Sequence, residues 1–218
     1  MSTHDVSTRR ARPWVLVAAV LPPLLLAGLG VMHPRELGDG TAVRWTVLHL
    51  VLLPLFPLLG VAPWLVARRG PRLAGGAALL LGFVFAVFYT ALDVPAGVGT
   101  GMLQQAGQTE GVPVLFRTGN ELSLVGVYAY LTATVLAAGV ALRRAGWSAL
   151  PGAVVVVLAA VSFLGSHVYW PVGVLTMLGL ALGWGLLLVP VRGGVHSSPP
   201  VAPELLAGSS LEHPGPPR

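Results

Sequence analysis

The stretch FVFAVFYTALDVPAGVGTGM, residues 83–102, decides how the rest of the chain is read. It begins as an apolar run, then carries Tyr89, Thr90 and Asp93, and continues through Pro95 into three closely spaced glycines. An apolar run of this kind is typical of a membrane-spanning helix. A carboxylate at its end lies near the boundary of the bilayer, where charge is costly and usually faces other protein. The stretch therefore predicts a membrane helix that ends in a polar site.

The composition agrees with a membrane protein whose main partner is the lipid bilayer. The chain is 55% hydrophobic and only 10% charged, with a mean hydropathy of +0.79, whereas soluble domains are about 25% charged. A chain this poor in charge cannot cover its own surface with polar groups in water. Cysteine is absent, which excludes disulfides, thiolate metal sites and cysteine nucleophiles.

Six apolar segments are long enough to cross a bilayer, which takes about 20 residues. They span residues 14–32, 42–67, 73–95, 122–142, 147–167 and 171–191. The sequence therefore predicts an all-α bundle of six transmembrane helices within residues 14–192. A cytoplasmic segment, 1–13, precedes the bundle. The segment 193–218 is rich in Pro, Ser and Gly without an apolar period, and is predicted to be a disordered cytoplasmic tail.

The arginines set the predicted orientation. All 13 basic residues are arginine, and most of them fall in short clusters between apolar segments, so the net charge of +5 is a topology signal and no sign of nucleic-acid binding. One side of the membrane carries Arg9, Arg10, Arg12, Arg68, Arg69, Arg72, Arg143, Arg144 and Arg192, and the other carries only Arg35, Arg44 and Arg117. The positive-inside rule then places both termini in the cytoplasm and the protein in the inner or plasma membrane.

On this topology the titratable side chains near bilayer depth gather toward the outer face. They are His33, Arg44, His49, Tyr89, Asp93, Glu121 and His167. Tyr89 and Asp93 are four residues apart and share a helix face, so they form part of a candidate polar cluster. The sequence does not show whether the faces of the different helices point at one another.

Several of these residues also have a purely structural interpretation. Thr118 and Glu121 precede an apolar run with the spacing of a capping box. Asp93 stands close before a proline and suits a helix cap or a turn. His33 also precedes a proline and suits an exposed loop. His49 lies inside a span, where a hydrogen bond to a neighbouring helix is as reasonable as metal ligation.

Three classes of function fit these observations. The first is a non-catalytic accessory, sensor or structural protein, which is favoured because it requires only packed helices and a satisfied polar cluster. The second is a metal protein: His33, His49, His167 and Asp93 make a donor set that suits zinc, which would activate water for hydrolysis, while two of the histidines would suit haem. The third is a small-molecule transporter, against which the inner half of the bundle offers almost no ionisable side chain.

Two resemblances accompany these hypotheses. Histidines and an aspartate at helix ends resemble the arrangement of intramembrane hydrolases of the alkaline ceramidase type, although the paired-histidine spacing of those enzymes is absent and they use more spans. RWTVLHLVLLPLFPLLG (residues 44–60) and FYTALDVPAGVGTG (residues 88–101) resemble small integral membrane proteins of GC-rich bacteria. No activity is established for such proteins, so this resemblance implies no catalytic residue. A homo-oligomer or a membrane partner protein is left open.

Overall fold

The computed structural model describes residues 13–189, and every regular element in them is a helix. Four helical stretches are long and apolar enough to cross a membrane: Pro13–Met32, Ala42–Ala67, Arg72–Gln105 and Thr109–Phe163. The helix Val172–Leu188 is apolar but shorter. The predicted all-α class is therefore confirmed for the described residues, and the length and composition of four helical stretches agree with a membrane protein. The predicted terminal segments lie outside the described residues, apart from Pro13.

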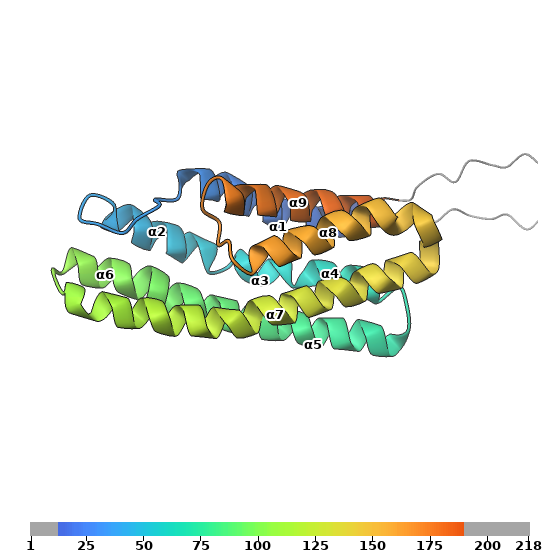
Figure 1. The fold of residues 1–218 in the computed structure, drawn as a ribbon, viewed down its shortest axis with the longest axis horizontal. Coiled ribbons are helices and arrows are strands. Elements are labelled where there is room, and N and C mark those ends of the chain that lie inside the picture. The colour runs from blue at the N-terminus through green and yellow to red at the C-terminus, as the bar shows by residue number, and fades with distance from the viewer. Residues whose placement is uncertain (1–12, 190–218) are drawn as a thin grey trace, which may run out of the picture.

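The chain runs back and forth along the long axis of the bundle (Figure 1). Its elements are α1 (Pro13–Met32), α2 (Ala42–Leu52), α3 (Phe56–Leu59), α4 (Val61–Ala67), α5 (Arg72–Leu92), the π-helical η1 (Asp93–Gly99), α6 (Thr100–Gln105), η2 (Thr109–Gly111), α7 (Val112–Ala145), η3 (Gly146–Ala149), α8 (Leu150–Phe163) and α9 (Val172–Leu188). The segments α2, α3 and α4 follow one another as one interrupted rod. The interruptions lie near Pro54 and Pro57, because proline cannot donate a backbone hydrogen bond. The 55-residue stretch Thr109–Phe163 folds back on itself at η3, so that α8 packs against α7.

Two helices extend farther than the sequence predicts. The third span was expected to end near residue 95, but the helix continues through η1 and α6 to Gln105. The following helix, α7, begins at Val112, well before the expected residue 122. Thr118 and Glu121 consequently lie inside α7, and the capping-box interpretation is wrong.

The unequal lengths of the helices create a step in the bundle. The stretch Arg72–Gln105 and helix α7 each contain 34 residues, which corresponds to about 50 Å, whereas a bilayer core is about 30 Å thick. Helices α1, α8 and α9 have 20, 14 and 17 residues. At one end the short helices stop while α2, α6 and the first half of α7 continue (Figure 1, left). The loop between α8 and α9 closes the short side at this step.

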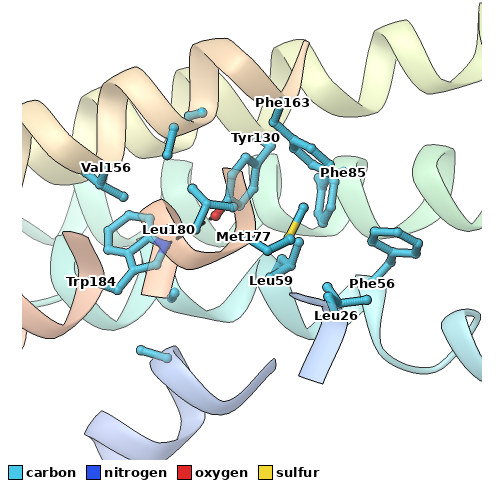
Figure 2. Close-up of a cluster of buried hydrophobic side chains, with 14 of the residues drawn as sticks. Leu26, Phe56, Leu59, Phe85, Tyr130, Val156, Phe163, Met177, Leu180 and Trp184 are labelled. Carbon is cyan, nitrogen blue, oxygen red and sulfur yellow. Dashed lines mark hydrogen bonds between the residues drawn. The ribbon is translucent and has the colours of Figure 1, made fainter. Parts of the chain in front are cut away.

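Large apolar side chains fill the bundle on the other side of the step. Figure 2 shows a cluster that includes Phe56, Phe85, Tyr130 and Trp184, all fully buried. The indole of Trp184 donates a hydrogen bond of 3.2 Å to the Tyr130 hydroxyl. The polar tips of these two side chains therefore satisfy each other inside an apolar core, as buried Tyr and Trp require.

Candidate metal centre

Three histidines from three separate segments meet at the step. His33 directly follows α1, His49 lies in α2, and His167 lies in the loop between α8 and α9. One ring nitrogen from each lies within 4.8 Å of those of the other two. His33 and His49 are 5% and 3% exposed, and the side chain of His167 is 12% exposed. The interpretation of His33 as an exposed loop residue is wrong, because the loop turns its ring into the protein.

Each imidazole is fixed through Nδ1. His33 Nδ1 donates to the Pro34 carbonyl at 2.7 Å, and His49 Nδ1 donates to the Trp45 carbonyl at 2.8 Å. His167 Nδ1 lies 2.8 Å from the Tyr89 hydroxyl. Metal-binding histidines almost always make such a second hydrogen bond, which fixes the tautomer and leaves Nε2 free to bind the ion.

The environment of His33 favours the neutral ring. Burial lowers the pKa of His33, the bond to the Pro34 carbonyl raises it, and the charge of Arg44 lowers it, so that the net change is downward. A neutral imidazole is the form that binds metal ions. Arg44 itself is exposed and acts on His33 through its charge.

Asp93 brings a carboxylate to the same place. It is completely buried, and its Oδ1 lies 4.0 Å from His167 Nε2. Asp93 opens η1, where the helix widens to a π-helix just before Pro95. Short π-helical segments occur frequently at functional sites. Asp93 stands at the C-cap position of α5, as one structural interpretation held, but the chain does not turn there, because the helix continues past it as η1.

Unpaired polar atoms are concentrated in this cluster. Among the described residues, five buried side-chain nitrogen or oxygen atoms have no hydrogen-bond partner, and four of them are His33 Nε2, His167 Nε2 and both carboxylate oxygens of Asp93. A buried carboxylate without a partner costs several kcal/mol. The separation of 4.0 Å between Asp93 and His167 is too long for a hydrogen bond. The four atoms therefore need something between them.

The spacing of the rings suits a tetrahedral ion. The ring centroids of His33 and His49 are 4.9 Å apart, and His167 lies 6.0 Å from each. With Zn–N bonds of about 2.1 Å, two tetrahedral imidazole ligands place their centroids about 5 Å apart. The ring centroids thus lie within about 1 Å of a zinc-binding arrangement, and the ring nitrogens, now within 4.8 Å of one another, would draw in to about 3.4 Å around the ion.

Close packing of η1 and α6 against α2 places His49 in the cluster. A Cβ atom on Gly97 would lie 2.1 Å from His49 Cδ2, and one on Gly101 would lie 2.2 Å from the Thr46 hydroxyl. These two glycines, one helical turn apart, let η1 and α6 approach α2. The indole of Trp45 spans the same contact and donates a long hydrogen bond of 3.4 Å to the Ala96 carbonyl. The sequence held one signal for this contact, the spacing of four between Gly97 and Gly101.

A cavity of about 540 Å³ adjoins the cluster. His49, His167 and Tyr89 line one wall, and the first half of α7 and the loop after α8 supply much of the rest. Because His49 and His167 line the cavity and His33 and Asp93 do not, an ion held by the four side chains would meet the cavity on the side of His49 and His167. The cavity gives the site an open face.

The structure brings together five of the seven residues in the predicted cluster. His33, His49, Tyr89, Asp93 and His167 meet, whereas Arg44 and Glu121 are exposed. Glu121 lines a different cavity, together with Arg117 on the same helix. The sequence did not predict Tyr169, whose ring centroid lies 4.7 Å from that of His33 and 5.2 Å from that of His167.

No protein-family model, curated protein or solved structure matched the chain. The resemblance to membrane proteins of GC-rich bacteria therefore remains a prediction, and the function is argued from the geometry of the site.

Proposed function

We propose that this protein is a membrane metalloprotein that binds one Zn²⁺, or a similar divalent transition-metal ion, through His33, His49, His167 and Asp93. The observation that carries the proposal is the convergence of three Nδ1-anchored imidazoles, with a buried carboxylate without a partner beside the third of them. A bound ion would satisfy the free Nε2 atoms and the carboxylate together. The ion would stabilise the carboxylate of Asp93, which is otherwise buried without a partner.

The donor set favours a bare ion over haem. Three imidazoles and one carboxylate are nitrogen and oxygen ligands that zinc accepts in a tetrahedral site. Haem needs two axial histidines with a clear plane between them for the porphyrin. His33 stands beside the pair formed by His49 and His167, with its ring centroid within 6.0 Å of both, and so occupies that plane.

The same proposal includes a membrane topology. α1, the rod from α2 to α4, the stretch Arg72–Gln105, α7, α8 and α9 would cross a bacterial inner or plasma membrane as six passes. The arginine clusters would lie in the cytoplasm together with both termini. The metal site would then lie at the outer boundary of the bilayer, and the step would project beyond it. A homo-oligomer or a partner membrane protein remains compatible with this arrangement.

Metal analysis of the purified protein tests the proposal. The protein would be purified in detergent through a tag without histidine, and its metals measured by mass spectrometry. We expect about one zinc per chain in the parent and in Glu121→Gln, and a large loss in His49→Ala. Glu121 is the matched control, because it is a ligand-type side chain outside the cluster. Equal metal in parent and His49→Ala, or none in any sample after zinc loading, would refute the site.

A further inference from the structure

The cavity beside the metal centre has one polar wall and one apolar rim. The described residues that line it include no arginine, lysine, aspartate or glutamate. Asn120, Ser123 and Ser166 supply neutral hydrogen-bonding groups, while Trp170 and Val172 stand at its edge with about half of their surface exposed. This lining suits an uncharged polar group attached to an apolar body.

A second cavity of about 510 Å³ continues from the first one. The two share Asn120, Ser123 and Leu164, and the second adds Arg117 and Glu121, which are one helical turn apart on α7. Charge therefore lies at the outer part of the combined space, and the metal ligands lie at its inner part. Beside it on α7, Leu124 is 49% exposed, so the space opens next to an apolar surface of the bundle.

We propose that this combined cavity admits the polar end of a membrane amphiphile, and that the metal centre hydrolyses a carboxylic ester in it. The inference rests on the proposed metal site. The apolar rim suits the hydrocarbon part of the amphiphile, and the charged outer part suits its water-facing group. A phosphate ester fits less well, because the described residues that line the cavity beside the metal ligands include no arginine or lysine, and Arg117 lines only the second cavity.

The reaction needs only water as co-reactant. His33, His49, His167 and Asp93 would hold the ion, which would supply water activated near neutral pH if a fifth position on the cavity side takes that water. Attack on the ester carbonyl forms the new C–O bond, and the bond to the alkoxy group then breaks. The proton from water ends on the departing alcohol. The products are one carboxylic acid and one alcohol, with no change of oxidation state.

Two fluorogenic esters test this inference, 4-methylumbelliferyl palmitate and 4-methylumbelliferyl acetate, both in detergent micelles with zinc-loaded protein. We expect a higher kcat/KM for the palmitate. Ser123 lines both cavities, so Ser123→Trp places a large side chain where they adjoin and should lower that value by about a hundredfold, as blocked positioning does. Ser148→Trp is the matched control at the opposite end of α7, in the exposed η3 turn. It should leave the rate unchanged.

Zinc content and lipid labelling are measured on the same samples. Both tryptophan variants should keep about one zinc per chain. A photoreactive diazirine palmitate, which represents the product class, should label residues 120–127 or 164–173 in the parent and not in Ser123→Trp. Zinc-loaded protein that hydrolyses neither ester, prefers the acetate or tolerates Ser123→Trp would overturn this inference and leave the metal site standing. Absence of zinc would overturn the metal site, and with it this inference.

Discussion

Gly97 packs directly against the side chain of His49, and we expect Gly97→Ala to disturb the metal site. The added Cβ atom would lie 2.1 Å from His49 Cδ2, 2.3 Å from Cγ and 2.7 Å from Cβ of the same residue. Carbon atoms in contact normally lie about 3.5–4.0 Å apart, so the ring must move by more than about 1 Å. The clash reaches the root of the side chain, which means that α2 has to shift as well. Ligand distances in a metal site tolerate only about 0.2 Å.

We therefore expect Gly97→Ala to weaken zinc binding at least as much as a lost second-shell contact does, by about 10–100-fold, and to cost about 1–3 kcal/mol of stability through overpacking. Competition with a coloured chelator measures the first effect, and thermal unfolding in detergent measures the second. Gly99→Ala is the matched control in the same π-helical segment. Its Cβ would meet the flexible end of Leu115 at 3.1 Å. Equal zinc affinities in the two variants would show that His49 is not held against Gly97 as described, or is not a ligand.

Three further predictions concern the carboxylate, the tyrosine and the helix packing. Zinc at about 100 times its Kd should stabilise the parent by about 2.7 kcal/mol, and Asp93→Asn should abolish most of this zinc-dependent rise in Tm; an undiminished rise would exclude Asp93 as a ligand. Tyr89→Phe keeps the packed ring but removes the hydroxyl that contacts His167 Nδ1, so zinc affinity measured by chelator competition should fall about 10–100-fold, and the unpaired ring nitrogen should lower stability without zinc by about 1–3 kcal/mol. Gly60→Ala places a Cβ 2.7 Å from the Gly82 carbonyl oxygen and should cost about 1–3 kcal/mol in thermal unfolding, whereas Gly76→Ala, with nothing within 4 Å, should not.

The length of the apolar segments was enough to predict the helical fold and helices long enough to cross a membrane. The boundaries failed where polar residues continue a helix past the expected end of an apolar segment, as in Gln104 and Gln105. These side chains reach across to the chain before and within α2: Gln104 donates to Asp39 at 2.7 Å, and Gln105 donates to Thr46 at 2.8 Å. Such contacts join residues about sixty positions apart, and a hydropathy pattern carries no information about them.

The sequence predicted most of the residues of the candidate site, but it did not predict that their side chains meet. Depth alone placed His33, His49, Asp93 and His167 toward one face, because each stands near the same end of its segment. Their convergence depends on the π-helical turn that carries Asp93, on the contact between Gly97 and His49, and on the inward turn of the loop that carries His33. Packing between helices sets how each helix is rotated and which path each loop takes. The periodicity of a single sequence does not contain this information.

The packing beneath the metal centre bears on the transporter hypothesis. Phe56 and Tyr89 contact the His167 ring, with centroids 5.2 and 5.8 Å from it. Below them the bundle is filled by fully buried side chains such as Phe85 and Trp184 (Figure 2). A transport site normally lies near the middle of the membrane, between two halves that rock about it. Here the ligands sit at one end of an apolar core, and the cavity that reaches them lies beside α7 and the loop after α8. An ion in this centre would therefore exchange through that cavity and not along the filled core, which favours a fixed metal centre over a conducted ion.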